Sequence, residues 1–483
     1  MVQPIENAVR TRYALNPTPE VPASAFNVRG GLTFAGANGQ PDGLYSTPNN
    51  NFMPRVGLTY RVDDRTVVRG GYGVYYGFLG QRRGDVIQSG YNQNTNLIAS
   101  RDNGQTFIAT LSDPFPTGIQ EPVGNAAGIE TFLGQGITFF NSDPKSSRIQ
   151  RWQVGIQREL PGRILVEAGY VGSYGSDLQT TRNLNATPNE YLSTSPVRDQ
   201  ARIDYLGANV PNPFAGQLPS TALAALQGQN IVRERLLRPY PQFDSVNTTT
   251  NEGWSWYHSM QLNLTRRFAG GYTLSGAYTY SDFVEALDFL NPADPQPWEG
   301  VSSVDTPHRL SINGIYELPF GRGRRFGTDA NAVVDGFIGG WQLSGIYTYQ
   351  SGFPLTWGNI IFTGNVDDID LPATERTLAR WFNTDAGFNK VSAQQLGSNV
   401  RTFPLRLENV RSDPVNNLDL SLTKNTRIKG KTVEVRLDSL NALNHPLLPG
   451  PNVGPTNAAF GQISASTQLN YARRTQVSFK FLF

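Results

Sequence analysis

The segment RTVVRGGYGVYYGF, at residues 65–78, alternates between two kinds of side chain along its length. Its odd positions are mostly arginine and glycine, whereas most of its even positions are large and apolar. The apolar set is Val68, Tyr72, Val74, Tyr76 and Phe78. Because successive side chains of a strand point to opposite faces, this period of two predicts a strand with one apolar and one polar face.

The same alternation recurs along the chain and predicts eleven strands. Most are longer than the roughly 5–6 residues usual in globular proteins. They reach the roughly 9–11 residues with which a tilted strand crosses a bilayer. The expected strands are 53–62, 65–79, 149–160, 164–175, 256–268, 272–283, 307–318, 340–351, 415–424, 431–443 and 470–483.

Two environments explain strands with one apolar and one polar face. In a soluble sandwich the apolar face is buried, whereas in a membrane barrel it meets lipid and the polar face lines the lumen. Strand length favours the barrel. So do the aromatic residues near the strand ends, because aromatic girdles mark the two interfaces of such barrels. The sequence therefore predicts an all-β fold, a transmembrane antiparallel β-barrel.

The connections between the expected strands alternate between short and long. Residues 63–64, 161–162 and 269–271 form tight turns, and 319–339 is the one stretched connection among the short ones. The long connections are 80–147, 176–255, 284–306, 352–411 and 444–469. Strict alternation places all long loops on one side of the sheet, as in outer-membrane barrels with short periplasmic turns and long extracellular loops.

The odd number of strands has a consequence for closure. With residues 1–52 as an extracellular loop or incomplete barrel start, the first and the eleventh strands both run inward. Bacterial single-chain barrels have an even number of strands, and lipid does not tolerate unpaired strand edges. We therefore expect residues 53–483 to be the carboxyl-terminal part of a larger barrel.

The composition excludes several classes of protein. A formal net charge of +2 provides no general attraction for nucleic acid. The absence of cysteine and the presence of only three histidines argue against disulfides, thiolate catalysis and a Cys- or His-rich metal site. No apolar run is long enough for a membrane helix, and residue 1 does not begin a signal peptide. We expect no enzymatic activity, no metal and no cofactor.

Four stretches of the chain together resemble the barrel of TonB-dependent outer-membrane receptors, especially the Oar-like branch, which carries a carboxypeptidase-regulatory-like domain. Each stretch is weak alone, but the four in this order are fairly specific, and the resemblance covers nearly all of 30–483. They are GGLTFAGANGQPDGLY…NNNFMPRVGLTYRVDDRTVVRGGYGVYYG (30–77), DTPHRLSINGIYELPFGRGRRF (305–326), GGWQLSGIYTYQSGFPLTW (339–357) and RLDSLNALNHP…AFGQISAS…RRTQVSFKFLF (436–483).

The resemblance implies a fold, a function and partners. Receptors of this family have twenty-two strands behind a signal peptide, a TonB box and a plug. This chain would then supply about 11 strands of a 22-stranded barrel, without signal peptide or plug. Its function would be uptake of a large, scarce ligand, such as an oligosaccharide, siderophore or peptide, across the outer membrane of a Gram-negative bacterium. Its partners would be outer-membrane lipid, the barrel-assembly machinery, the extracellular ligand and, through the missing plug, the TonB energy-coupling protein.

Two sets of aromatic residues are the candidate functional residues. Phe479, Phe481 and Phe483 end the last strand and resemble the signal that the barrel-assembly machinery reads, although an ordinary apolar terminus would have the same pattern. The loop tryptophans lie beside amide and acidic residues that suit sugars or peptides. Packing of the loops against the barrel rim is their plainer interpretation. These tryptophans are Trp254, Trp298, Trp357 and Trp381.

Two further features have structural interpretations. His308, which begins an expected strand, has no partner pattern for a metal and is expected to be structural. Residues 371–383 (LPATERTLARWFN) are expected to form a short helix with Leu371, Leu378 and Trp381 packed inward.

Two other functional classes stay open at the level of the sequence. One is an outer-membrane barrel that binds or adheres through its loops and transports nothing. The other is a soluble β-rich lectin or hydrolase, which a folded monomer in detergent-free solution would favour.

Overall fold

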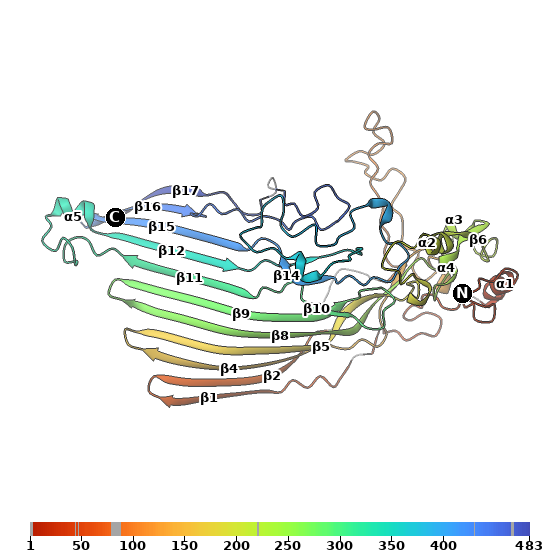
Figure 1. The fold of residues 1–483 in the computed structure, drawn as a ribbon, viewed down its shortest axis with the longest axis horizontal. Helices are drawn as coiled ribbons and strands as arrows, with labels where there is room; N and C mark the ends of the chain where they lie inside the picture. Colours follow the sequence, from red (N-terminus) through yellow and green to blue (C-terminus); the bar gives the residue numbers. More distant parts are fainter. Residues whose placement is uncertain are drawn as a thin grey trace.

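One antiparallel sheet dominates the computed structural model, which describes residues 3–43, 45–46, 48–78, 88–219, 222–428, 430–464 and 468–483 (Figure 1). Eleven strands follow one another across it in chain order. They are β1 (Arg55–Asp63), β2 (Thr66–Tyr76), β4 (Arg148–Leu160), β5 (Ile164–Asn183), β8 (Val246–Ala269), β9 (Tyr272–Asp288), β11 (His308–Glu317), β12 (Trp341–Gln350), β15 (Val415–Ile428), β16 (Lys431–Leu440) and β17 (Arg474–Leu482). The eleven predicted strands are therefore confirmed; residue 79 of the second prediction lies outside the described residues.

Short connections lie at one end of the sheet, here called the short-turn end. The β8–β9 turn contains Gly270 and Gly271 at φ 61° and 88°, values that favour glycine because it lacks a Cβ. The stretched connection between β11 and β12 holds helix α5 (Ala332–Ile338), whose first turn is capped by the side chain of Asn331. Figure 1 shows α5 and the carboxyl terminus together at this end.

Three strands extend well beyond their predicted limits at the opposite, long-loop end. β5 continues to Asn183, β8 begins at Val246 and β9 continues to Asp288, so parts of the expected loops are strand. The extensions pair with each other: Thr180 lies opposite Thr250, and their hydroxyls are 2.7 Å apart. Polar threonine and asparagine dominate there, which hides the apolar alternation on which the prediction depended.

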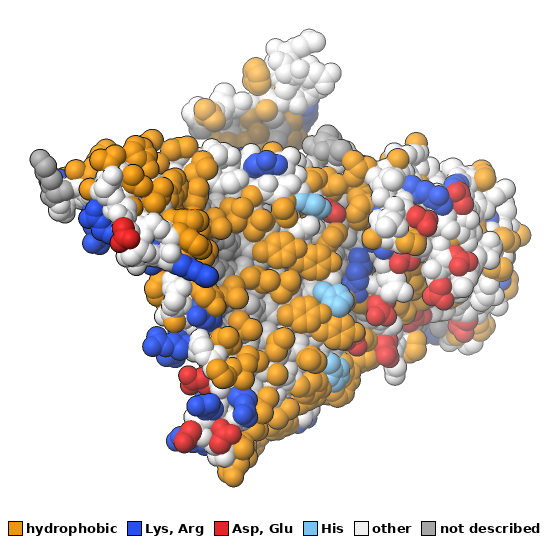
Figure 2. All heavy atoms as spheres, turned by 60° about the vertical axis from the view of Figure 1, so that its left-hand side comes forward, with side chains coloured by type: hydrophobic (Ala, Val, Ile, Leu, Met, Phe, Trp, Pro, Cys, Tyr) orange, Lys and Arg blue, Asp and Glu red, His pale blue; other side chains and the backbone are white. Residues whose placement is uncertain are grey.

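The two faces of the sheet differ in the predicted way. In β12 and β15, Leu343 lies opposite Leu422 and Tyr347 opposite Leu418, all on one face, whereas Ser344 and Ser421 share the other face. Figure 2 shows the apolar face as a continuous orange surface in which the pale blue histidine side chains lie, with charged residues gathered toward its ends. We call this the apolar face and the opposite one the luminal face.

The sheet is curved but does not close into a barrel. β1 pairs only with β2, and β17 pairs only with β16, so both outer edges of the sheet are unpaired among the described residues. Both edge strands run from the long-loop end to the short-turn end. None of the described helices is both long and apolar enough to cross a membrane.

Residues near the amino terminus belong to a packed cap at the long-loop end. Helix α1 (Gln3–Tyr13) buries Val9 and Tyr13, and the Tyr13 ring stacks on Phe26 at a centroid distance of 3.7 Å. The cap core joins α1 mainly to residues from three stretches, 26–37, 132–139 and 210–246. It also contains the short elements η1 (Gly128–Glu130), β3 (Ile137–Phe139), η2 (Asn189–Tyr191), α2 (Gln200–Gly207), β6 (Asn209–Pro211), α3 (Ala224–Gln227), β7 (Asn230–Val232) and α4 (Arg233–Leu236).

A second cluster, the mouth cluster, forms mainly from the 352–411 connection, with residues 298–301, Val453 and Phe460 packed beside it. Its small elements are β10 (Trp298–Val301), β13 (Pro354–Thr356), η3 (Val366–Ile369), η4 (Ser392–Gln394) and β14 (Arg406–Arg411). The predicted helix over 371–383 is wrong, because this segment forms turns. Non-local contacts override its local preference: the backbone N–H of Trp381 donates to the carbonyl of Gly461, and that of Asn383 to the carbonyl of Ile369.

The facing assignment predicts unequal effects of arginine at two neighbouring positions of β15. Leu420 lies on the apolar face over Gly345, whereas Ser421 lies on the luminal face opposite Ser344. Leu420→Arg should lower the free energy of unfolding by about 2–4 kcal/mol, because it places a charge in lipid, and Ser421→Arg should lower it much less. Urea unfolding of the barrel in vesicles measures both, and equal losses would contradict the assignment.

Candidate functional site

The luminal face of the first strands carries arginines separated by glycines. Arg55 of β1 lies opposite Gly73 of β2, and Gly73 lies opposite Arg151 of β4. Further toward the short-turn end, Arg69 of β2 lies opposite Thr59 and Gly155. Because alternate residues share a face, the three arginines stand on the luminal side of adjacent strands.

These strands enclose a hollow of about 1090 Å³, which we call the luminal groove. The glycines at 57, 71 and 73 leave its floor without side chains. On the side away from β1 the groove is bounded by Tyr257, Phe283 and Val304. It therefore combines guanidinium groups with an apolar, aromatic wall.

The three arginines of the groove have no carboxylate partner among the described residues. Arg55, Arg69 and Arg151 are exposed and form none of the ion pairs found there. Arg55 lies 4.8 Å from the ring centroid of Tyr75, a cation–π contact. Among the residues that the structure describes, no acidic side chain lines the groove. The groove is therefore a region of positive charge facing the lumen.

Arginines of the mouth cluster have the opposite environment. Arg406 is buried and pairs with Glu285 at 3.3 Å and Asp288 at 3.1 Å, so it fixes β14 against the extension of β9. Arg411 donates to the Asp305 carboxylate at 2.7 Å. Burial raises the pKa of Asp305 above its ordinary value, and the hydrogen bond from Arg411 opposes this effect.

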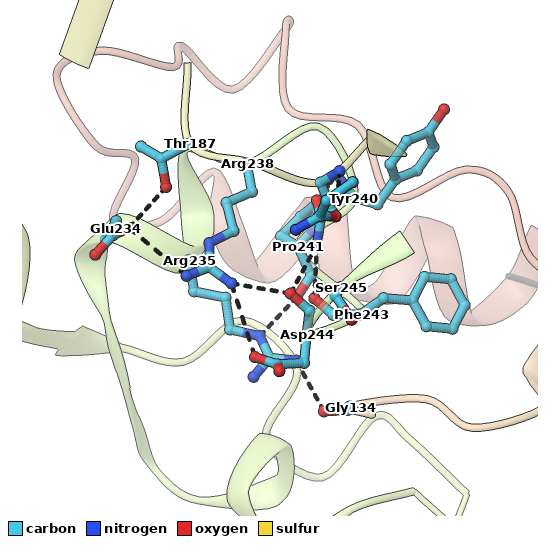
Figure 3. A network of polar contacts seen from close by, with 12 residues as sticks. Gly134, Thr187, Glu234, Arg235, Arg238, Tyr240, Pro241, Phe243, Asp244 and Ser245 are labelled. Carbon is cyan, nitrogen blue, oxygen red and sulfur yellow. Dashed lines mark hydrogen bonds and ion pairs between the residues drawn. The ribbon is translucent and has the colours of Figure 1, made fainter. Parts of the chain in front are cut away.

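A polar network holds the cap together, as Figure 3 shows. Arg235 donates to the carbonyls of Pro241 and Gly134 at 3.0 and 3.1 Å, which joins two stretches about a hundred residues apart in the sequence. Arg238 pairs with Glu234, whose carboxylate also accepts from Thr187 at 2.7 Å. Burial lowers the pKa of Arg235 below its usual range. The network is a structural support and exposes no reactive group.

The four predicted loop tryptophans occupy different environments. Trp357 is only 2% exposed and stacks on Phe388 at 5.6 Å, so it belongs to the core of the mouth cluster, in agreement with the packing interpretation. Trp254 lies in β8 two residues before Trp256, on the apolar side of the sheet. Trp298 and Trp381 are partly exposed, and the Trp381 indole donates to the carbonyl of Arg411 at 2.7 Å. The structure therefore does not bring the four together.

The terminal phenylalanines lie where the sequence places them. Phe479 and Phe481 of β17 pair with Val435 and Val433 and point to the apolar face, with about two thirds of their surface exposed. Phe483 follows the last residue of β17 and is fully exposed. Their role in barrel assembly stays a prediction.

Sequence reasoning missed two repeated arrangements. Tyr170 and His258 form one Tyr–His pair across β5 and β8 (Oη–Nδ1 2.7 Å), and Tyr278 and His308 form another across β9 and β11 (2.8 Å). His308 thus has an aromatic partner on a neighbouring strand. The cluster of luminal arginines was missed as well, because strand register is needed to place these residues side by side. Among the described residues, no group of three or more His, Asp or Glu could hold a metal ion.

Comparison with known proteins assigns the chain to a family. Residues 2–476 match the profile of the outer membrane beta barrel domain. The chain belongs to this family, and its location is the outer membrane. A search of curated proteins finds no significant match.

Solved structures of outer-membrane transporters are similar to the chain at low identity. The outer membrane transporter YddB from Escherichia coli is 10% identical, with a TM-score of 0.35 over 87% of this chain and 38% of YddB. The FrpB iron transporter from Neisseria meningitidis is 10% identical, with a TM-score of 0.36 over 88% of this chain and 38% of FrpB. For the pyoverdine receptor FpvA from Pseudomonas aeruginosa the values are 10%, 0.38, 89% and 36%. The chain thus spans well under half of each protein, and likeness at this level carries no argument about function.

The buried pairs of the mouth cluster predict a local loss of stability. Arg406→Leu leaves the Glu285 carboxylate, which is 6% exposed, without its guanidinium partner. We expect the 352–411 connection to lose about 3–5 kcal/mol of protection against opening, because an unpaired buried charge remains. Amide hydrogen exchange of this segment measures the loss.

Arg376→Leu is the matched control in the same connection. Arg376 pairs with Asp370 at 2.7 Å, but both side chains are more exposed than the Arg406–Glu285 pair. A pair with this much solvent contact contributes about 0–1 kcal/mol. Equal effects of the two substitutions would show that Arg406 does not hold the mouth cluster in place.

Proposed function

We propose that this chain is the carboxyl-terminal part of the barrel of a TonB-dependent receptor of the Oar-like branch. Its function is uptake of a large, scarce ligand, an oligosaccharide, a siderophore or a peptide, from the long-loop side. The observation that carries this proposal is the open polar trough of eleven strands beneath a large packed mouth. A ligand can be held at the mouth and then passed along the polar luminal face.

Strand direction supports the proposal of a larger barrel. Because β1 and β17 run in the same direction, they cannot pair with each other in an antiparallel sheet. A second copy inserted in the same orientation would meet the same obstacle. Closure therefore needs an odd number of further strands, of which the first and the last run toward the long-loop end. Eleven such strands would complete a barrel of about 22.

Ligand capture falls to the mouth cluster and the cap in this proposal. Trp298 and Trp381 are the tryptophans whose partial exposure suits contact with a ligand. The burial of Trp357 and the position of Trp254 on the apolar side favour packing roles for these two. Contact with the TonB energy-coupling protein belongs to a plug in the lumen, and recognition by the assembly machinery belongs to Phe479, Phe481 and Phe483.

A surface-binding barrel without transport is the second candidate. Two hydrophobic cores at the long-loop end favour this candidate, because they allow the loops to fold as a packed binding module. The two candidates differ in their dependence on energy coupling.

Transport is tested in source cells with and without this protein, each with and without a functional energy-coupling protein. Labelled oligosaccharides, ferric siderophores and peptides are supplied as separate pools. We expect internalised label from one pool to fall to background when either protein is removed. Surface-bound label without internalisation, unchanged by loss of energy coupling, would favour the binding barrel and reject transport.

The size of the folded barrel is tested on a gel of unheated and heated outer membranes, probed with an antibody to residues 431–483. We expect a heat-shifted band well above the 53.1 kDa of this chain. A heat-shifted band at that mass would show that strands from another chain complete the sheet. A band at that mass only in the soluble fraction would reject the membrane barrel.

The assembly role predicts that Phe483→Ala changes the yield of folded protein but not its stability. Phe483 is fully exposed, so its loss should change the free energy of unfolding by less than about 0.5 kcal/mol. The folded fraction in cell outer membranes should nevertheless fall several-fold. Leu482→Ala, on the luminal face, is the control; equal yields for the two variants would reject the assembly signal.

A further inference from the structure

The luminal groove contains three arginines that form no ion pair among the described residues. Arg55 and Arg151 flank Gly73 on neighbouring strands, roughly 10 Å apart at the backbone given a strand spacing of about 4.8 Å. Arg69 stands on the same face farther along β2. In the mouth cluster, Arg406 and Arg411 each pair with a carboxylate. The groove arginines form no such ion pair among the described residues.

We infer that the luminal groove is a binding site for a small solute that carries carboxylate or phosphate groups. This inference rests on the proposed receptor function, because it assumes that solutes enter the lumen from the long-loop side. The planar guanidinium group donates two parallel hydrogen bonds to a pair of oxygens of either a carboxylate or a phosphate. Three such groups in a concave wall without acidic lining also concentrate anions by their combined field.

The shape of the groove suits a solute with an apolar as well as an anionic part. Its volume of about 1090 Å³ lies just above the roughly 300–1,000 Å³ usual for small-ligand sites. The glycine floor lets a ligand approach the backbone of β1 and β2 closely. Tyr257 and Phe283, which lie in the same register row across the strands as Arg55 and Arg151, offer aromatic surface beside the arginines.

The position of the groove favours a solute over an internal polypeptide segment. Arg55 is the first residue of β1, so the groove begins at the long-loop end of the sheet. Val304, from the connection between β10 and β11, lines the same hollow. A ligand released from the mouth would therefore meet the arginines first.

Binding is tested by calorimetry on the native protein extracted from source-cell outer membranes in detergent, at low salt. The probes are citrate and tripolyphosphate, with a neutral trisaccharide as the uncharged comparison. We expect both anions to bind to the native protein. Any binding of the trisaccharide should be the same in the native protein and in the arginine variants. Arg151→Gln and Arg55→Gln should each weaken anion binding by about tenfold, since each removes a charge-assisted hydrogen bond.

Arg309→Gln is the matched control. Arg309 faces the lumen from β11, is exposed and forms no ion pair among the described residues, but it does not line the groove. This variant should bind both anions within about twofold of the native protein, because Arg309 lies outside the groove and makes no direct contact with a ligand there. An equal loss in Arg309→Gln would show general charge attraction and overturn the site.

Two other outcomes would overturn the inference. One is absence of anion binding by the native protein. The second is lower thermal stability of Arg55→Gln and Arg151→Gln without any change in anion binding. That result would show that the arginines hold a polypeptide segment in the groove. Calorimetry measures binding without transport, whereas internalised label measures uptake. The two experiments therefore distinguish failure of this binding site from failure of the proposed uptake. A protein that binds citrate in an arginine-dependent manner but internalises nothing would retain the site and lose the transport function.

Discussion

The backbone hydrogen-bond ladder is the constraint on which the rest of this structure depends. A bilayer offers no water to an unpaired N–H or C=O group, so each membrane-spanning strand must pair on both sides. The chain meets this requirement over nine of its eleven principal strands, which have a partner on each side in continuous antiparallel register. The requirement is left unmet only at the outer edges of β1 and β17. The further strands that the proposed function requires would pair with these two edges.

The long-loop end follows different rules because water can satisfy its backbone. Here irregular segments are held by side chains, in two hydrophobic cores and a few buried ion pairs. Arginine serves both regions in different ways. In the mouth cluster and the cap it is paired or bonded to carbonyl groups and gives rigidity. On the luminal face of β1, β2 and β4, arginine has no carboxylate partner among the described residues. Its charge can therefore interact with a ligand in the lumen.

The strands could be predicted because their signal is local. A period of two is visible within ten residues, as in 65–78, and needs no knowledge of the neighbour. The extension of β8 back to Val246 was missed because TTTNEG carries no apolar alternation, although its pairing with β5 continues. The helix expected over 371–383 failed because hydrogen bonds to Gly461 and Ile369 fix that segment in turns.

The candidate sites depended more heavily on information outside the local sequence. A tryptophan beside amide residues has the same sequence context whether it is exposed or packed, so the sequence could not distinguish the buried Trp357 from the partly exposed Trp298 and Trp381. Likewise, Arg55 and Arg151 lie almost a hundred residues apart and become neighbours only through the register of three strands. Phe483 was placed correctly because its position depends on a single strand.

The length of β8 has a consequence for how the cell presents this protein. Its 24 residues span roughly 80 Å, whereas a tilted strand needs only about 9–11 residues to cross a bilayer. With the long loops outward, the part before residue 256 lifts the cap and the mouth roughly 20 Å above the hydrocarbon, even at a tilt of about 45°. Antibodies and bacteriophages approaching the cell therefore meet the cap before they meet the membrane. Selection by such agents would act on the cap. The strands below must keep their apolar residues toward lipid.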